Sequence, residues 1–405
     1  MLKKLVAVVA IVSLTLTAIS PVNAAVKAGA ACSKAGNTAI ASGKTFTCIK
    51  SGKKLVWDKG KENKSSNSNG LSSSSTAQNS IPALTKPISF ENLDPYWTSV
   101  TAYQNVRNFA QEQAKPNLIS QIYLSPNLGN RPYESYLYGL EEIAKLWGPI
   151  FKSPNINIIL FTELDSDWID QKQKDLMGKY LRNPSSQLQS NRLKESGCNI
   201  GGFYLPNLIV FCVKDDKQIS SRENLKLAAY SAFPHEYTHF VGMTSPEINN
   251  LGIDSIGRLS ACWFWEGSAT FYGYALAGKS LDKFDQYRLS SLHDFLYTYD
   301  QRRNQQLGTL IKKLQENNSQ TVIDLFRELE NDVGSCKEIH NAYALGEMAT
   351  ETLVAIYGQT GINNLILEFG KSNNWPEAFQ KTFGLSLTDF YIKITPYLAS
   401  QAKLF

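Results

Sequence analysis

The chain has 405 residues, of which 43% are hydrophobic and 11% aromatic, enough to build the core of one large domain or two smaller ones. Charged residues make up 19%, too few for a disordered chain and typical of a secreted globular protein. The net charge of +5 includes Lys3 and Lys4 of an N-terminal segment that we expect to be removed, which leaves +3, and no run of Lys or Arg forms a patch. This bias is too weak to argue for nucleic acid, and we expect no nucleic-acid partner.

Residues 1–25 have the three parts of a signal peptide. Lys3 and Lys4 form the basic part, Leu5 to Ile19 the apolar part, and Val22-Asn23-Ala24 a small-residue cleavage site. A lipoprotein anchor at Cys32 is the alternative, but the residues before Cys32 lack the usual Leu. The apolar run is short for a membrane span, and no second stretch is long enough to cross a bilayer. We therefore expect a secreted, extracellular protein.

Six cysteines follow the signal peptide, and an even number in an exported chain predicts disulfides. Six cysteines allow 15 connectivities. Proximity in the sequence favours Cys32–Cys48 and Cys198–Cys212, which leaves Cys262–Cys336. A cysteine–zinc site is the alternative, but the sequence has no C-x-x-C pair.

Two short regions precede the main domain. Residues 26–58 predict strands and turns closed by one disulfide, and they resemble a cysteine-paired module of exported actinobacterial proteins that ends in a strand like Leu55-Val56-Trp57. Such a module would either contact the cell wall or surface, or serve as a passive cap. Residues 59–87 are rich in Ser, Asn, Lys and Gly and predict a disordered linker. The main domain then covers 88–405.

The main domain is expected to begin with mixed structure and to become helical after residue 220. Asn155–Thr162, Gly201–Tyr204 and Leu208–Val213 predict strands, the last two joined by a turn at Pro206-Asn207. Pro234 lies inside one predicted helix, which is therefore either kinked or restarted there. Helical spacing of apolar residues is found at 98–114, 134–149, 224–243, 261–277, 282–297, 304–315, 319–330, 338–357, 361–370 and 386–400.

The predicted helix 224–243 contains the sequence His-Glu-Tyr-Thr-His. His235 and His239 are four residues apart, so both rings project from one face of a helix and can bind one Zn²⁺. Glu236 is offset around the helix and can reach a water molecule on the metal. The alternative is an ordinary helix whose histidines are structural, although the chain has only four histidines in all.

A catalytic zinc needs a third protein ligand, and Glu266 is the candidate. It lies between Trp265 and Gly267 in an apolar helical stretch, where a carboxylate is costly to bury without a partner. Gly267 and Ala269 are small, which would let this helix pack closely against the helix of His235 and His239. An exposed helical Glu is the alternative.

This pattern resembles the gluzincin metallopeptidases, and within them the peptidase-MA-like family. The resemblance rests on H-E-x-x-H followed by Trp-Glu-Gly-Ser-Ala, and it extends to Tyr343–Gly358 and Ala378–Phe390, which are similar to later segments of that family. It covers residues 155–400. It implies an α+β, zincin-like fold in which a small mixed sheet precedes a mainly helical C-terminal half, with the metal site between them.

The resemblance also implies roles for single residues. Zn²⁺ would be held by His235, His239 and Glu266, and Glu236 would be the general base that takes a proton from the metal-activated water. Gluzincins use a Tyr or His to stabilise the oxyanion, and Tyr343 is the candidate here. His340 is the second candidate, and His293 is assigned a structural or surface role. An ordinary buried tyrosine is the alternative for Tyr343.

The hairpin before the H-E-x-x-H helix has an implied role as well. In zincins an edge strand at this place pairs with extended peptide, and Gly201, Gly202 and Phe203 would lie on it. A plain sheet edge is the alternative. Two features depart from the pattern: no G-A-M-E-N-like segment supports aminopeptidase activity, and Thr270 stands where an Asp would be expected. The residues that orient His235 and His239 are therefore not identified.

The sequence as a whole predicts a secreted zinc metallopeptidase, an endopeptidase that acts on a peptide or protein substrate. A zinc-bearing, non-catalytic binding protein of the cell surface is the alternative from another functional class. A secreted structural domain without metal is a third hypothesis, which zinc analysis of the purified protein would test.

Overall fold

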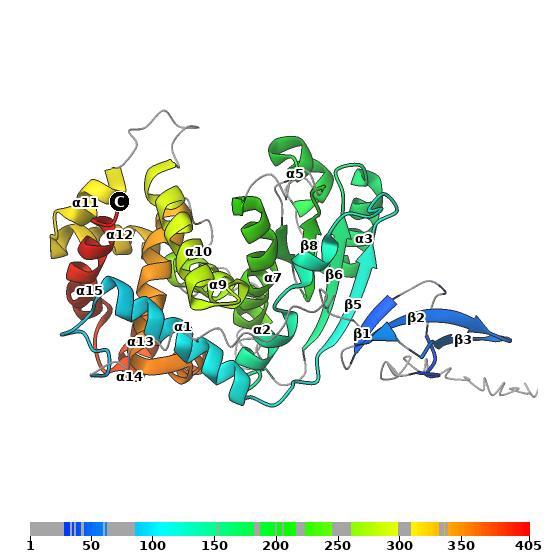
Figure 1. Cartoon of the computed structure of the whole chain (residues 1–405), viewed down its shortest axis with the longest axis horizontal. Helices are drawn as coiled ribbons and strands as arrows, with labels where there is room; N and C mark the ends of the chain where they lie inside the picture. The colour runs from blue at the N-terminus through cyan, green and yellow to red at the C-terminus, as the bar shows by residue number, and fades with distance from the viewer. Residues whose placement is uncertain are drawn as a thin grey trace, which may run out of the picture.

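The computed structural model describes residues 28–32, 35, 38–41, 44–59, 61–62, 86–151, 154–181, 187–198, 201–204, 206–215, 223–244, 261–298, 309–331, 336 and 339–405. The predicted signal peptide and most of the predicted linker lie outside these residues. The architecture combines a sheet at one end of the molecule with a larger helical part at the other (Figure 1). The expected α+β class is confirmed at this level.

The elements follow one another as strands with a few helices first and helices alone afterwards. The strands are β1 Thr38–Ala41, β2 Lys44–Ser51, β3 Lys54–Trp57, β4 Lys61–Glu62, β5 Ile119–Leu124, β6 Asn155–Phe161, β7 Gly201–Tyr204 and β8 Leu208–Cys212. The helices are α1 Pro95–Glu112, α2 Leu140–Trp147, α3 Ser166–Met177, α5 Gln189–Ser196, α7 Glu223–Thr244, α9 Cys262–Ala277, α10 Leu281–His293, α11 Thr309–Gln315, α12 Ser319–Asn331, α13 Ile339–Ser372, α14 Trp375–Phe383 and α15 Leu387–Ala402. Short turns of other helix types span Tyr133–Leu137, Gly178–Tyr180 and Asp294–Thr298.

The sheet is mixed, and its strand order is β3-β2-β1-β5-β6-β8-β7. Strands β5, β6 and β8 are parallel to one another, whereas β7 pairs antiparallel with β8 and ends the series. Side chains alternate between the two faces of a strand. Accordingly Ile158 and Leu160 of β6 join the large core around α7, while Ile159 and Phe161 join a smaller core under α3.

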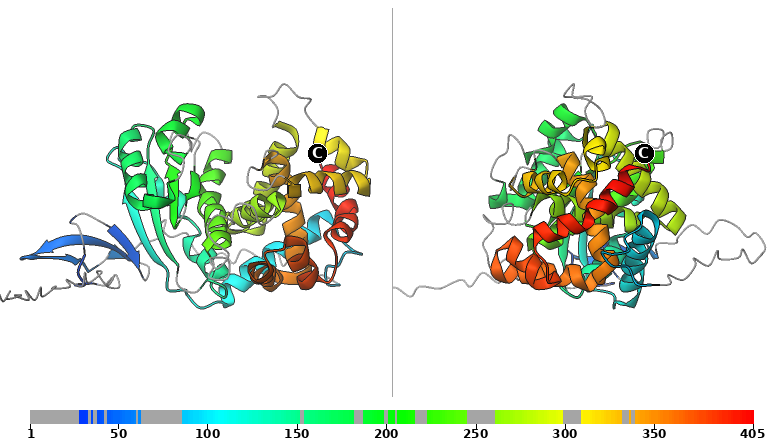
Figure 2. Two further views of the ribbon diagram at one scale, coloured as in Figure 1. Left: turned by 180° about the vertical axis from the view of Figure 1, so that it is seen from behind. Right: turned by 90° about the vertical axis from the view of Figure 1, so that its left-hand side faces the viewer.

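The N-terminal strands extend this sheet. Strand β1 pairs antiparallel with β5, and Thr38 lies opposite Ile122. Strand β2 pairs with β1, β3 and β4. A single sheet therefore contains strands from both sides of the predicted linker, and the N-terminal strands project from the end of the molecule away from the helical part (Figures 1 and 2).

Helix α9 runs through the middle of the molecule and packs against both α7 and α13. Its contact with α13 is unusually close, because a Cβ at Gly346 would lie 1.8 Å from the carbonyl oxygen of Trp263 and 2.8 Å from Cα of Gly267. The expectation that Gly267 faces the H-E-x-x-H helix is wrong. Gly267 faces α13, and Gly273 is the small residue towards α7, where an added Cβ would lie 3.5 Å from Cβ of His235.

Helix α7 continues through Pro234 from Glu223 to Thr244. The proline ring packs towards the start of α2, because a Cβ at Gly139 would lie 2.8 Å from Cγ of Pro234. Gly139 has a φ of 77°, a conformation that favours glycine. Because α7 is continuous, His235 and His239 are about one helical turn apart and project from the same face of the helix.

All three expected disulfides are present. Cys32–Cys48 closes the N-terminal strands, Cys198–Cys212 fixes the segment before β7 to β8, and Cys262–Cys336 joins the start of α9 to the approach to α13. Within the described part of the chain, no helix is both long enough and apolar enough to cross a membrane.

A buried polar network joins α10, α13 and α15. The guanidinium of Arg288 pairs with the carboxylate of Glu351, with Nη2 2.8 Å from Oε1, and Nη2 also lies 3.3 Å from the hydroxyl of Tyr397. Glu347, one turn before Glu351, is also buried and has one carboxyl oxygen 3.5 Å from the Ser291 hydroxyl. Its other oxygen has no hydrogen-bond partner among the described residues.

Candidate metal centre

Two histidine rings converge on the side of α7 that faces α9. The Nε2 atoms of His235 and His239 are 3.2 Å apart, and the ring planes are nearly perpendicular, at 84°. Residues four apart on a helix lie one above the other, which explains the convergence. The four-residue spacing therefore positions two nitrogen ligands for one ion.

Glu266 enters the same space from α9. Its Oε2 atom lies 3.8 Å from Nε2 of His235 and 3.5 Å from Nε2 of His239. Zinc bonds to nitrogen and carboxylate oxygen of about 2.1 Å imply ligand–ligand distances of about 3.4 Å in a tetrahedral site. The three observed distances scatter around that value, so these residues fit a tetrahedral dication with one position left for a further ligand.

The protonation states of the three side chains suit a metal. Burial lowers the pKa of His235 to about 3, so its ring is neutral at pH 7 and offers a lone pair. Burial alone would lower the pKa of His239, but the negative charge of Glu266 raises it overall. Burial likewise opposes the charged form of Glu266, but His239 lowers the pKa of its carboxyl below the usual value. A dication can take the place of the proton between His239 and Glu266.

Glu236 lies beside this group and faces the edge strand β7. Burial raises the pKa of its carboxyl to about 7, while the positive charges of His239 and Arg192 act in the opposite direction. The backbone N–H of Phe203 in β7 donates a hydrogen bond to the carboxylate. A carboxyl that titrates near neutral pH can both accept and return a proton.

Tyr343, near the start of α13, is the tyrosine that reaches the group. It is hydrogen-bonded to the carboxylate of Glu266, and its ring centre lies 6.2 Å from that of His235. His340, the second candidate, lies with its ring against Phe295 and Tyr343, at 5.9 Å from each. His293 is at the exposed end of α10. The structure therefore joins Tyr343 to the ligand group by a hydrogen bond and places His340 against the ring of Tyr343.

Trp265 is part of the site and was missed in the sequence. Its ring stacks on the ring of His239, with centres 4.4 Å apart and planes at 25°. Gly242 makes room for it, because a Cβ there would lie 2.9 Å from the Trp265 ring. The buried Nδ1 of His239 has no hydrogen-bond partner among the described residues, and the Thr270 hydroxyl bonds to the backbone carbonyl of Glu266. Among the described residues, the stacked indole is therefore the group that restricts rotation of the His239 ring.

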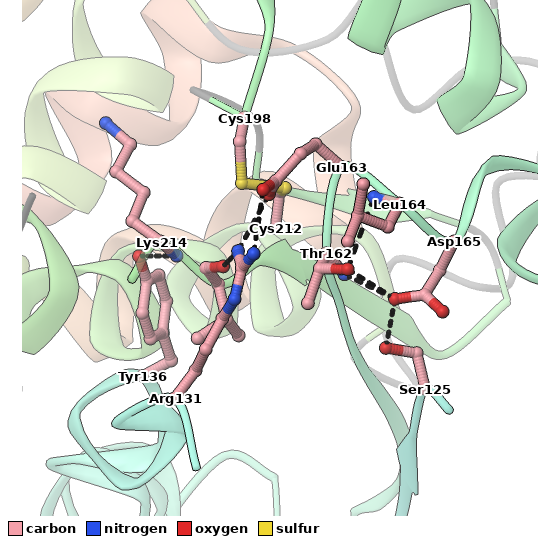
Figure 3. The surroundings of a disulfide bond; sticks show 11 residues. Ser125, Arg131, Tyr136, Thr162, Glu163, Leu164, Asp165, Cys198, Cys212 and Lys214 are labelled. Carbon is pink, nitrogen blue, oxygen red and sulfur yellow. Dashed lines mark hydrogen bonds and ion pairs between the residues drawn. A yellow bond between two sulfur atoms is a disulfide. The ribbon is translucent and has the colours of Figure 1, made fainter. Parts of the chain in front are cut away.

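A second group of potential ligands does not fit a metal. Glu163, Cys198 and Cys212 lie within 4.8 Å of one another, but the two sulfurs form a disulfide and offer no thiolate (Figure 3). The Glu163 carboxylate is bound by Arg131 through two hydrogen bonds of 2.7 Å. This group is therefore structural.

Comparison with known proteins finds no relative: no protein-family model, no curated protein and no solved structure matches the chain. The likeness to gluzincins and to the actinobacterial module stays a prediction from the sequence. Function is accordingly argued from the group of His235, His239 and Glu266 and from its neighbours.

Proposed function

We propose that the protein is a secreted, zinc-dependent peptidase that hydrolyses peptide bonds with Glu236 as the general base. The observation that carries the proposal is the convergence of two imidazole nitrogens and one carboxylate oxygen at tetrahedral distances, with a second carboxyl, that of Glu236, next to them. Zinc bound there would activate a water molecule and polarise the scissile carbonyl. Proton transfer, stabilisation of the oxyanion and binding of the peptide would be carried out by the chain's own residues.

Glu236 handles the proton. Its buried carboxylate can take a proton from the attacking water and pass it to the leaving amine, which requires a pKa near the working pH. The hydrogen bond from the backbone of Phe203 holds the carboxylate towards β7, the place where a substrate would lie. Loss of this base is expected to lower turnover about 10²- to 10⁴-fold.

Tyr343 supplies a hydrogen-bond donor. Its hydroxyl is hydrogen-bonded to the Glu266 carboxylate, and its ring centre lies 6.2 Å from that of His235, so the donor lies beside the three ligands, where an oxyanion would form. Burial raises the pKa of Tyr343, which keeps the hydroxyl protonated and able to donate.

Strand β7 provides a template for extended peptide. It ends the series of strands, and no other strand in the described chain pairs with its outer side. Its backbone groups can therefore bind a peptide as a further strand, directly next to Glu236. The three disulfides are consistent with an oxidising, extracellular setting.

The test combines metal analysis with proteolysis. Wild type, Glu236→Gln and His235→Asn are compared for zinc content and for cleavage of a reduced, carboxymethylated protein substrate. We expect one zinc per chain and cleavage for wild type, one zinc without cleavage for Glu236→Gln, and loss of both for His235→Asn. His293→Asn, at the exposed end of α10, is the matched control and should behave as wild type.

Two outcomes contradict the proposal. If purified wild type contains no zinc and takes none up, the metal assignment is wrong. If it holds zinc and cleaves nothing, the protein is a zinc-bearing binding protein, which is the alternative that the sequence leaves open.

A further inference from the structure

An arginine lies at the edge strand without an ion-paired carboxylate among the described residues. Arg192, on α5, donates a hydrogen bond from Nη1 to the hydroxyl of Tyr204 at the end of β7. Gln189 donates a second hydrogen bond of 2.6 Å to the same hydroxyl. Among the described residues no carboxylate forms an ion pair with Arg192, whereas Arg131 and Arg288 each bind one. The half-buried guanidinium is therefore held in place without an ion pair, and its charge also acts on the nearby buried carboxylate of Glu236.

Gly202 lets this guanidinium reach the edge of the sheet. A Cβ at Gly202 would lie 3.1 Å from the ring of Tyr204, 3.2 Å from its hydroxyl and 3.3 Å from Nη1 of Arg192, so the tyrosine and the guanidinium together fill the space that a side chain of residue 202 would occupy. Gly202 and Tyr204 share one face of β7, and Phe203 points to the other face, where its ring packs on Phe240 of α7. Arg192 thus belongs to the face of β7 turned away from α7.

The geometry of strand pairing determines which side chain of a bound peptide would lie next to Arg192. A peptide paired with β7 places one residue opposite Gly202, with its side chain on the same face and its Cβ about 5 Å from the position of a Cβ at Gly202. The side chain of that residue points at Arg192. The side chain of the next residue along the peptide points to the other face of the sheet, on which α7, Glu236 and the ligand group lie. The residue that meets Arg192 is therefore a near neighbour of the scissile bond.

We propose that Arg192 is a specificity-determining residue that binds a carboxylate of the substrate, so that the peptidase selects peptides with an acidic group opposite Gly202. This inference rests on the proposed function. A guanidinium binds a carboxylate through two parallel hydrogen bonds, and an aspartate or glutamate side chain or a free C-terminal carboxylate offers the same chemistry. Tyr204 and Gln189 are positioning residues, because they orient the guanidinium through the tyrosine hydroxyl.

The first experiment measures cleavage preference. A library of peptides from a digested proteome is incubated with wild type, and the cleaved bonds are read by mass spectrometry. We expect Asp or Glu to be enriched at one fixed position near the cleaved bond, with kcat/KM about 10- to 100-fold above that of matched Asn or Gln peptides. Amidated and free-acid forms of the same peptides show whether the carboxylate is a side chain or a chain end.

The variants assign the preference to Arg192. Arg192→Gln should lose the acidic preference, through a higher KM for acidic peptides, so that acidic and neutral peptides are cleaved with the same kcat/KM, while zinc content is unchanged. Arg192→Glu should shift the preference to Lys or Arg. Lys194→Gln removes the same charge from an exposed position of α5 and should behave as wild type. The inference is overturned if wild type shows no acidic preference, or if Arg192→Gln keeps it.

A binding measurement separates failure of this inference from failure of the proposed function. If zinc-loaded wild type cleaves nothing, fluorescence anisotropy compares a dye-labelled acidic peptide with its neutral counterpart. Tighter binding of the acidic peptide to wild type but not to Arg192→Gln keeps the role of Arg192 in a non-catalytic protein. Equal binding of both peptides to both proteins rejects it.

Discussion

The hydroxyl of Tyr343 is the group that distinguishes stabilisation of an oxyanion from simple metal binding. Tyr343→Phe removes the donor without removing a metal ligand, so turnover should fall about 10²- to 10³-fold while zinc content stays at one per chain. Steady-state kinetics and metal analysis measure the two quantities. Tyr357→Phe, on the same helix but bonded to the backbone of Phe383, is the control. Unchanged turnover of Tyr343→Phe would remove Tyr343 from the mechanism.

Trp265 orients His239 by stacking rather than by hydrogen bonding. Trp265→Leu leaves the ring of His239 free to turn, and we expect zinc affinity to fall about 10-fold or more, the usual effect of losing a residue that supports a metal ligand. Trp265→Phe keeps an aromatic face and should keep most of the affinity. Competition with a chelator gives both values, and equal affinity for Leu and Phe variants would contradict the stacking role.

Glu347 makes stability depend on pH. Burial raises the pKa of its carboxyl to about 8, with the charge of Arg288 opposing and that of Glu351 adding to the effect. An unfolded Glu titrates near pH 4.3, so between about pH 4.5 and 8 the folded state binds more protons than the unfolded state. The free energy of unfolding should therefore fall with rising pH in this window, by about 1 kcal/mol per pH unit.

Urea unfolding of Glu347→Gln at several pH values tests this dependence. The amide cannot lose a proton, so the decline between pH 5 and 8 should be smaller than in wild type. Glu328→Gln, at an exposed position of α12, should leave the decline as it is. An unaltered slope in Glu347→Gln would show that another group titrates.

The crossing of α9 and α13 is the contact between elements on which the site depends most. Glu266 lies next to Gly267 on α9, and Tyr343 lies three residues before Gly346 on α13, so the glycine contact sets the distance between ligand and donor. Gly346→Ala would place a methyl group 1.8 Å from the Trp263 carbonyl oxygen. The helices must separate, and we expect a loss of about 3 kcal/mol in stability together with weaker zinc binding.

Thermal unfolding and zinc titration of Gly346→Ala check this expectation. Gly148→Ala is the control, because Gly148 has a helical φ of −52° and the nearest atom to an added Cβ is 3.2 Å away. It should change stability far less. If Gly346→Ala is as stable as wild type, α9 and α13 can move apart without loss of stability, and the expectation is wrong.

Local spacing in the sequence predicted most of the ligand group, whereas long-range packing was not predictable. The two histidines and Glu236 lie within one helix turn, and Glu266 is conspicuous as an acid in an apolar segment. Trp265 is conspicuous only as part of the Trp-Glu-Gly-Ser-Ala motif, and Arg192 carries no signal at all, because the roles of both depend on which other element they face. Gly267 shows the limit most clearly: its small size indicates a close contact, but nothing in the local pattern says with which helix.

Prediction of strands from the local sequence pattern was limited in the same way. Strands β6, β7 and β8 were predicted from β-branched runs and a turn, and so was the hairpin that brings β7 to the edge. Strand β5, Ile119–Leu124, was missed because its sequence mixes polar and apolar residues. Its pairing with β1, about 80 residues earlier in the chain, is a non-local contact that periodicity does not report.

At the scale of the whole molecule, the ligand group lies between the sheet and the helical part, with contributions from both. Glu236 accepts a hydrogen bond from the backbone of β7, while Glu266 and Tyr343 lie on α9 and α13 of the helical part. Metal binding should therefore couple the two parts. Removal of zinc with a chelator is expected to lower the unfolding temperature, and zinc added back should restore it in proportion to the logarithm of its concentration. An unfolding temperature that is insensitive to zinc would contradict this coupling.

The pairing of β1 with β5 has a consequence for self-association. An exposed strand recruits strands from other molecules, and proteins avoid aggregation by covering such edges. Here the N-terminal strands cover β5, which leaves the outer side of β7 as the place where a foreign chain can join the main part of the sheet. Deletion of residues 28–62 should therefore increase the share of dimers and larger species in light scattering relative to the intact chain. The N-terminal strands would thus leave β7 as the open edge of the main part of the sheet, next to Glu236.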